Sequence, residues 1–521
     1  MTDMTSSTTD FAPTESRRAP LRLILAGLML AMVLAALDQS IVNTALPAVA
    51  SDLGGMAHLS WVVTAFMLSS TNATPIFGKL GDMYGRRNLL LGCITLFILA
   101  SALCGLAQSM PELIGFRLLQ GIGGGGLMTL TQTTISDVVG PRERLRYQGL
   151  FTGAFAFSSL AGPVLGGGLT TALSWRWVFY VNVPVGLVAL ALLISALKLP
   201  AVEKRRHHID WFGALLLTGA ATALLLLFSL AGSVFPRISP QSGALLAAGL
   251  LLLALFVWQE TRAREPMVDL SLFAIPAFTI GAVTTGAMTF AMMSAMVFLP
   301  LYLQLVLGMS AAQSGLVMVP QIVMMLLSSV LGGRLSARIG RPKLFLVGGI
   351  ALEASGLGLL ALMAHQEAGV VPVLGALAVL GTGMGSAMPN ATVIVQNAVP
   401  RVSLGVATAG MSFLRSLGGA LGVAVSGGVM TSLLATKLQG LEGIDAAGIA
   451  TGGIELIATL STALQAEVAE AFRQAISASF LIGAGVMALA LGIALQLRGT
   501  ELGPTGAGKT PALDATAEKS A

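Results

Sequence analysis

Fourteen separate stretches of this chain are long and apolar enough to cross a lipid bilayer, and this feature limits the fold more than any other. A helix needs about 20 mainly apolar residues to cross a hydrocarbon core of about 30 Å. The stretches cover 21–46, 59–78, 88–108, 112–136, 146–170, 177–197, 211–231, 242–260, 277–303, 311–333, 343–364, 370–396, 404–430 and 477–497. We therefore expect an all-α integral membrane protein with 14 transmembrane helices.

The composition agrees with a lipid environment. Hydrophobic residues make up 55% of the 521 residues, charged residues make up 10%, and the mean hydropathy is +0.85. So few polar side chains cannot cover a water-soluble globule. We expect no nucleic-acid partner although the net charge is +5, because the sequence shows no soluble basic domain with interleaved aromatic residues.

The basic residues predict the orientation in the membrane. Cytoplasmic loops of membrane proteins are rich in Lys and Arg. If both chain ends lie on one side, that side receives 23 of the 29 Lys and Arg residues, the other side receives 4, and 2 lie within spans. We therefore expect a multi-pass protein of the inner (cytoplasmic) membrane with both termini in the cytoplasm.

A short repeat divides the chain into two related halves. The segment 78–87 (GKLGDMYGRR) follows the second span, and 333–341 (GRLSARIGR) follows the tenth with its glycines and basic residues in register. Repeated halves around a central cavity are a recurrent transporter design. The predicted units are a disordered cytoplasmic N-terminus at 1–20, a six-helix bundle at 21–198, a two-helix insertion with cytoplasmic loops at 199–275, a second six-helix bundle at 276–498 and a disordered cytoplasmic tail at 499–521.

The second bundle contains the only long outward loop, at 435–476. Apolar residues recur there at helical spacing, which predicts an amphipathic helix on the outer membrane surface or over the cavity, or a plain structural cover. These residues are Ile454, Ile457, Leu460, Leu464, Val468 and Phe472.

Four charged residues, Asp38, Arg117, Glu353 and Arg415, lie well inside predicted spans. A charge at the bilayer centre costs about 2.5–3.5 kcal/mol on insertion scales and by default marks a polar pathway. Asp38 and Glu353 could each carry a proton, whereas Arg117 stays charged and could act on a neighbouring acid. We treat Asp38, Arg117 and Glu353 as candidate proton-coupling residues. Structural roles stay open for each, including a pairing of Glu353 with Arg415.

Two groups of small and charged residues are candidates for conformational gating. The glycines of 78–87 suit a tight turn in which Asp82 accepts hydrogen bonds from backbone amides or Arg, either as a latch or as a simple cytoplasmic turn. In the fifth span, small residues permit close helix contact and Pro163 removes a backbone donor. The candidates are Gly78, Gly81, Asp82, Gly85, Arg86, Arg87, Gly162, Pro163, Gly166 and Gly167.

Together these motifs resemble the major facilitator superfamily, specifically its fourteen-helix drug:proton antiporters of the EmrB/QacA type. The resemblance covers about residues 20–498. It rests on the segments 37–47 (LDQSIVNTALP), 78–87, 117–121 (RLLQG), 162–167 (GPVLGG) and 415–422 (RSLGGALG). Met83 departs from the loop motif, where a basic residue is common, and Ser158 departs from a glycine of the fifth-helix motif.

The resemblance implies two six-helix bundles plus two inserted helices, and export by rocker-type alternating access driven by proton re-entry. The 117–121 segment is similar to a motif linked to proton coupling, and the fifth-helix motif argues for antiport over symport.

Methionines crowd the ninth and tenth spans and suit a cavity for varied apolar compounds, although ordinary helix packing is the favoured explanation. The predicted cavity residues are Asn43, Gln120, Met288, Met292, Met296 and Arg415. The expected substrates are small amphiphilic or cationic compounds that exchange with protons, and the lipid bilayer is the other partner. The sequence leaves any periplasmic adaptor unknown.

We expect no enzyme activity, cofactor or metal. Residues 503–510 fit the phosphate-loop pattern, but a working loop needs a strand and a nucleotide-binding domain, and only eleven residues follow Thr510. An ATP-driven pump that uses this tail is therefore the least expected alternative. A proton-coupled importer or exporter of a specific metabolite or lipid would share the architecture and stays open.

Overall fold

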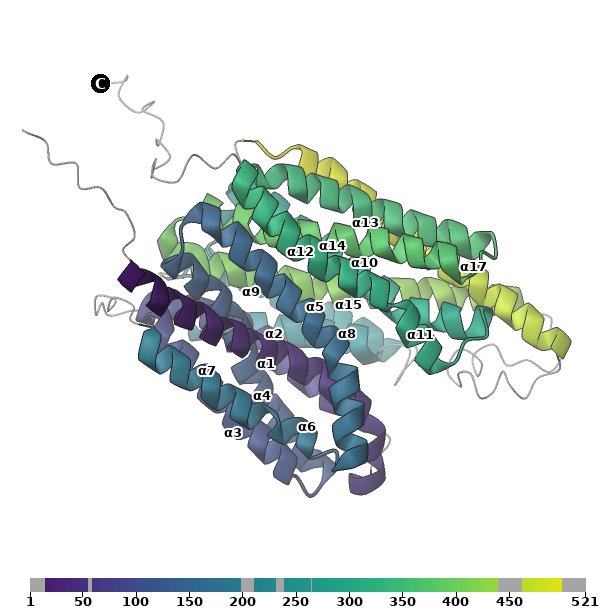
Figure 1. The fold of residues 1–521 in the computed structure, drawn as a ribbon, viewed down its shortest axis with the longest axis horizontal. Coiled ribbons are helices and arrows are strands. Elements are labelled where there is room, and N and C mark those ends of the chain that lie inside the picture. Colours follow the sequence, from purple (N-terminus) through teal and green to yellow (C-terminus); the bar gives the residue numbers. More distant parts are fainter. Residues whose placement is uncertain are drawn as a thin grey trace, which may run out of the picture.

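The computed structural model describes residues 15–54, 59–197, 210–230, 239–263, 265–438 and 462–498, and these ranges are almost entirely helical. The predicted amphipathic residues Ile454, Ile457 and Leu460 and the phosphate-loop match at 503–510 lie outside the described residues. Figure 1 shows long, roughly antiparallel helices without a strand in the described ranges.

The helices follow the predicted spans closely. The first half contains α1 (Glu15–Leu53), α2 (Leu59–Tyr84), α3 (Arg86–Leu106), α4 (Met110–Val138), α5 (Pro141–Ala172), the short α6 (Trp177–Tyr180) and α7 (Asn182–Ala196). The insertion contains α8 (Trp211–Leu230) and α9 (Pro240–Glu260). The second half contains α10 (Pro276–Leu301), η3 (Tyr302–Val306), α11 (Ala311–Val317), α12 (Val319–Ile339), α13 (Pro342–His365), α14 (Val370–Ala398), α15 (Leu404–Leu438) and α17 (Thr462–Leu495).

Thirteen helical segments in the described ranges are long and apolar enough to cross a membrane, and α2 runs beside them as the fourteenth crossing. The low hydropathy of α2 has a physical cause. Ser70, Thr71 and Thr74 line a cavity between the halves, and Asn72 donates to the Thr222 hydroxyl of α8 at 2.9 Å. Its polar residues therefore face protein and cavity, where polar groups have partners.

The two halves each have a buried apolar core, and the inserted pair packs on their outside. In the first half α1 packs on α5 and α7, and α4 packs on α2 and α3. In the second half α14 packs on α12 and α13, and α10 packs on α15 and α17. Helix α8 packs on α9 and contacts α2 and α15. This arrangement confirms the predicted architecture of two six-helix bundles plus two inserted helices.

The repeated loop motif has the same backbone role in both halves. Gly85, between α2 and α3, has φ of 89°, and Gly340, between α12 and α13, has φ of 78°. Residues with a Cβ rarely adopt such positive φ values, so glycine is needed at both turns. This conformational need explains why the two glycines stand in register in the sequence.

The direction of each membrane-crossing helix can be described relative to the two ends of the bundle. We call the end at which α1 begins the basic end, because Arg86, Arg142 and Arg341 lie there, and we call the other the opposite end. Helix α17 finishes at the basic end, where Lys343 Nζ donates to the carbonyls of Leu495 and Leu497. An even number of crossings returns the chain to the end at which it started.

The last crossing begins earlier than predicted. The sequence predicts an outward loop to residue 476, but α17 already begins at Thr462. Val468 and Phe472 are buried, and Arg473 donates to the carbonyls of Ala364 and His365 at the end of α13. These contacts hold the first turns of α17 against the end of α13. Likewise, residues 15–20 belong to α1, although the sequence predicts disorder there.

Candidate functional site

A buried ionic cluster joins three helices of the first half. Asp38 of α1 has no exposed surface. Its Oδ2 accepts from Arg117 Nη1 of α4 at 2.6 Å, and its Oδ1 accepts from Gln120 Nε2 at 2.9 Å and from Asn182 Nδ2 of α7 at 2.7 Å. Three donors on two oxygens match an ionised carboxylate, which can only accept hydrogen bonds.

Arg117 is held as firmly as Asp38. Its Nη1 also donates to Gln120 Oε1 at 2.8 Å, its Nε donates to the Val62 carbonyl at 3.3 Å, and its guanidinium lies 4.2 Å from the centre of the Phe66 ring. Removing one partner of a buried ion pair costs about 3–5 kcal/mol, because the other charge remains buried and unpaired. Loss of the Asp38 charge would therefore leave the Arg117 charge buried and unpaired.

Asn182 is a functional candidate that the sequence reading missed. It bridges the cluster by donating both to Asp38 and to Ser101 Oγ at 3.0 Å, and Ser101 in turn donates to the Phe179 carbonyl at 2.9 Å. One signal was available, because Asn182 is an isolated amide in an otherwise apolar predicted span. Buried polar groups need partners, so this amide predicted a polar contact inside the bundle.

The other buried acid has no such partners. Glu353 of α13 is 1% exposed, and neither carboxyl oxygen has a hydrogen-bond partner among the described residues. It packs against α14 at Gly383, where a Cβ would lie 2.9 Å from Glu353 Cγ. The described residues therefore show no ion pair between Glu353 and Arg415.

Two adjoining cavities lie between the halves. The first, of about 400 Å³, we call the outer cavity because it lies toward the opposite end; it is lined by α1 and α5 of the first half and by α10, α12 and α14 of the second. The second, of about 300 Å³, we call the inner cavity; it adds residues of α2, α4, α8 and α15. The cavities share Gln39, Phe155, Met292, Met293 and Met325.

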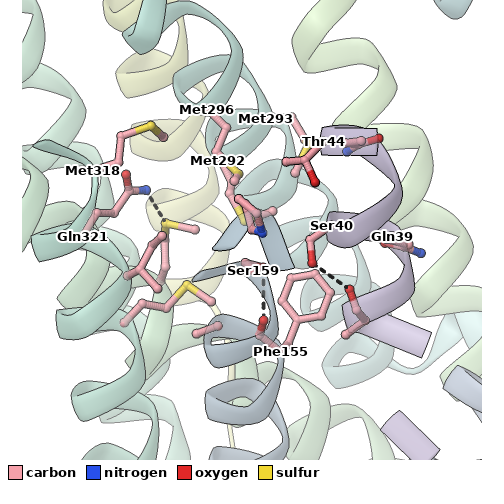
Figure 2. A pocket seen from close by; sticks show the side chains of 17 residues that line it. Gln39, Ser40, Thr44, Phe155, Ser159, Met292, Met293, Met296, Met318 and Gln321 are labelled. Carbon is pink, nitrogen blue, oxygen red and sulfur yellow. Dashed lines mark hydrogen bonds between the residues drawn. The ribbon is translucent and has the colours of Figure 1, made fainter. Parts of the chain in front are cut away.

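The outer cavity combines a methionine-rich wall with a polar one. Figure 2 shows Met318 and Gln321 reaching into the space from one side, and Ser40 and Thr44 from the side of α1. Ser40 Oγ also donates to the Ser158 carbonyl of α5 at 2.9 Å. A flexible apolar surface with a few polar groups suits amphiphilic compounds of varied shape.

The loop motif joins the two halves at the basic end, in a contact that we name the first latch. Asp82, at the end of α2, accepts from the backbone amides of Gly405 and Val406 at 2.9 and 3.0 Å and from Arg86 Nη2 at 2.7 Å. The amides belong to the first turn of α15, where free N–H groups and the helix dipole favour an anion. Arg86 also pairs with Asp137 of α4 at 2.6 Å.

The repeat forms a second latch with opposite polarity. Its acid is replaced by Ala337, but the carbonyls of Ala337 and Arg338 accept from the guanidinium of Arg142, at the start of α5. The helix dipole makes the C-terminal end of α12 favourable for a cation, just as it makes the N-terminal start of α15 favourable for an anion. The sequence did not predict this role for Arg142, because its partners are backbone carbonyls, which leave no pattern in the sequence.

Sequence comparison decides the family. Residues 28–423, well over half of the chain, match the model of the Major Facilitator Superfamily. The chain belongs to this superfamily.

Two similar proteins of the superfamily have names that refer to multidrug transport or resistance. The chain is 35% identical to the multidrug transporter protein MdtP of Bacillus subtilis over 429 residues, which cover 81% of this chain and 79% of MdtP. It is 34% identical to multidrug resistance protein 3 of the same organism over 444 residues, covering 84% and 86% of the two chains.

A solved superfamily structure agrees in fold. The proton:xylose symporter XylE superposes with a TM-score of 0.62 at 16% identity, over 91% of this chain and 95% of that chain. This likeness supports the major facilitator fold.

The superfamily fold is closed here at the basic end. Hydrogen bonds that join the two halves in the described ranges lie at or toward that end, including Ser136 to Gln396 at 2.9 Å and Arg144 to Asn397 at 2.8 Å. In Figure 1 the halves lie together where α1 begins and separate toward the opposite end. Together with the outer cavity, this indicates a conformation that faces the opposite end.

Four of the six predicted cavity residues line at least one of the two cavities. Asn43, Met292 and Met296 line the outer cavity and Arg415 lines the inner one. The remaining two lie elsewhere. Gln120 is fully buried against Asp38, and Met288 is fully buried in the core of the second half, because their helices turn these side chains away from the space between the halves.

Asp38 itself lies on the face of α1 away from the cavities. Its helix neighbours Ile41 and Val42 are buried in the first half, whereas Gln39, Ser40 and Asn43 line the cavities. A proton on Asp38 and a substrate in the cavity would thus touch opposite faces of one helix.

The predicted gating residues of the loop motif make two kinds of contact, close glycine packing and hydrogen bonds from arginine. A Cβ on Gly78 would lie 2.7 Å from the Gly405 carbonyl, and one on Gly81 would lie 2.8 Å from Leu130. Arg87 donates to the carbonyls of Leu197 and Ile194, which ties α3 to the end of α7.

The small residues of α5 do not behave alike. Cβ atoms on Gly162 and Gly166 would collide with Ser40 and with the Ile41 backbone of α1. Gly167 has open space around it, and Pro163 is exposed toward the outer cavity.

Proposed function

We propose that this protein is a proton-coupled exporter of small amphiphilic compounds, a multidrug efflux antiporter that works by alternating access. The observation that carries the proposal is the pair of cavities between the halves, with a methionine-rich wall and a buried Asp38–Arg117 pair in the helix layer behind it. The relatives MdtP and multidrug resistance protein 3 carry names of the same kind. We place the protein in the cytoplasmic membrane with the basic end inside, following the Lys and Arg bias.

Helix α1 couples the proton to the substrate in this proposal. When Asp38 is ionised, its bonds to Arg117, Gln120 and Asn182 hold α1 against α4 and α7. A proton on Asp38 removes the charge that Arg117 balances and weakens these bonds. Since the other face of α1 lines the cavities, a shift of this helix changes the binding surface. The proton and the substrate are therefore exchanged without contacting each other.

The latches set the two end states. Asp82 and Arg142 hold the basic end closed while the opposite end releases substrate and admits a proton. Opening of both latches admits the next substrate from the cytoplasm. Glu353 is a second candidate for protonation, since its carboxyl is buried without a partner in the described residues.

The driving force is sufficient for efflux. A charge that crosses 100 mV gains about 2.3 kcal/mol, so a potential of about 150 mV supplies roughly 3.5 kcal/mol per proton. At about 1.4 kcal/mol per tenfold ratio, this supports concentration ratios of several hundred.

The direction of proton movement tests the proposal. Energised inverted membrane vesicles that contain the protein should lose protons from their lumen when an amphiphilic substrate is added outside, and Asp38→Asn vesicles should not respond. Proton movement in the same direction as substrate would indicate import and would refute the antiport proposal.

A further inference from the structure

The two cavities contain a single charged residue. Their walls are built from methionine, phenylalanine, serine, threonine, glutamine and small residues, and Arg415 of α15 is the one charged side chain among the described lining residues. A substrate that enters the inner cavity therefore meets one positive charge and no negative charge.

Arg415 has no counterion within the described ranges. The buried acid of the first half, Asp38, is already paired with Arg117 at 2.6 Å. The buried acid of the second half, Glu353, has no hydrogen-bond partner for either oxygen. The guanidinium of Arg415 stays charged in proteins, so it lies in a low-dielectric cavity wall with its charge uncompensated.

Two amide side chains from the other half face the same inner cavity. Gln132 of α4 and Gln148 of α5 are 4% and 3% exposed. The Oε1 of Gln132 and the Nε2 of Gln148 have no hydrogen-bond partner in the described part of the chain. Buried amide groups normally have partners, so the Gln148 donor and the Gln132 acceptor are available to polar ligand groups in this cavity.

We propose that the inner cavity selects organic anions, namely amphiphiles with one carboxylate, sulfonate or similar group and an apolar body. Arg415 binds the anion, the Gln148 amide donates to it, and Met292, Met293 and Met325 contact the apolar body. Guanidinium groups bind such oxyanions through two parallel N–H bonds. The inference rests on the proposed efflux function and reverses the charge of the cationic substrates that the sequence suggests.

The location of these groups gives the anion a mechanical role. Arg415 belongs to the second half, whereas Gln148 belongs to the first. An anion held between them joins the halves, and their separation during rocking divides the site. A cation in the same place would lie beside an uncompensated positive charge, which is unfavourable in a cavity of low dielectric constant.

Equilibrium binding tests the charge preference. The probes are one naphthalene fluorophore bearing a sulfonate, a neutral amide or a quaternary ammonium group, added to purified protein in nanodiscs without a proton gradient. The wild-type protein should bind the sulfonate at least tenfold more tightly than the ammonium probe. Arg415→Gln should lower sulfonate affinity at least tenfold and leave the neutral probe unchanged, and Arg415→Lys should lose less.

Gln148→Leu provides an independent variant, in which sulfonate affinity should fall about threefold. Tighter binding of the ammonium probe by the wild-type protein, or an equal loss of all three probes in Arg415→Gln, would overturn the proposal. Because the measurement uses no gradient, it stands apart from the efflux proposal: absent proton coupling would refute that proposal and leave the charge preference as measured.

Discussion

At the scale of single residues, the key relationship is between two buried carboxyl groups in different surroundings. Asp38 accepts three hydrogen bonds and faces a guanidinium, whereas both oxygens of Glu353 lack partners in the described ranges. An ionised carboxylate is tolerable in the first setting and costly in the second. The two acids therefore differ in their surroundings, although both looked alike as acids within apolar spans.

The contribution of Asn182 can be measured directly. Asn182→Leu removes one donor from Asp38 and the partner of Ser101. Loss of a hydrogen bond to a buried charge costs about 1–3 kcal/mol. We expect a lower melting temperature and slower proton-driven transport, both read on purified protein in liposomes. Ser101→Ala is the matched control and should cost less, because Asp38 keeps all its donors; an equal loss would place the role of Asn182 in packing alone.

At the scale of elements, close contact between α1 and α5 connects the ionic cluster to the cavity. Gly162 and Gly166 place the backbone of α5 directly on Ser40 and Ile41 of α1. The same turn of α1 carries cavity residues on one face and Asp38 on the other. A movement of α1 would therefore be transmitted to α5.

A matched pair of substitutions tests this contact. Gly166→Ala introduces a Cβ that would lie 2.6 Å from the Ile41 carbonyl, whereas the Cβ of Gly167→Ala meets nothing within 4 Å. Overpacking of this kind costs about 1–3 kcal/mol. We expect Gly166→Ala to reduce transport and melting temperature and Gly167→Ala to change neither. Equal behaviour of the two variants would show that the close approach of α1 and α5 has no functional weight.

The latches act at the same scale and can be tested by thiol labelling. Cys93 and Cys104 are buried, so they add little background when Ser136→Cys, between the halves at the basic end, is labelled from that side. Asp82→Ala leaves two α15 amides without their acceptor, at about 1–3 kcal/mol each. We expect several-fold faster labelling in Asp82→Ala and in Arg142→Ala. Unchanged rates in both variants would show that neither contact closes this end.

At the scale of the whole molecule, the apolar stretches and the repeated loop were sufficient to predict the fold. The length and apolar composition of each stretch specify a membrane helix, because lipid leaves few alternative structures for the backbone. Gly85 and Gly340 mark the equivalent turns of the two halves. The site was harder to predict. The sequence identifies Asp38, Arg117 and Arg415 as charges in spans, but it does not give the direction in which each helix faces. Gln120 and Met288 were thus assigned to a cavity from which their helices turn them away.

In the proposed mechanism a proton on Asp38 drives the rocking of the two halves, and purified protein in sealed liposomes tests this step most directly. With an imposed pH and voltage difference, the wild-type protein should accumulate an amphiphilic probe, and collapse of both differences should abolish accumulation. Asp38→Asn should fold normally and show no gradient-dependent accumulation. Unchanged accumulation after both differences are collapsed, or full activity of Asp38→Asn, would contradict the account.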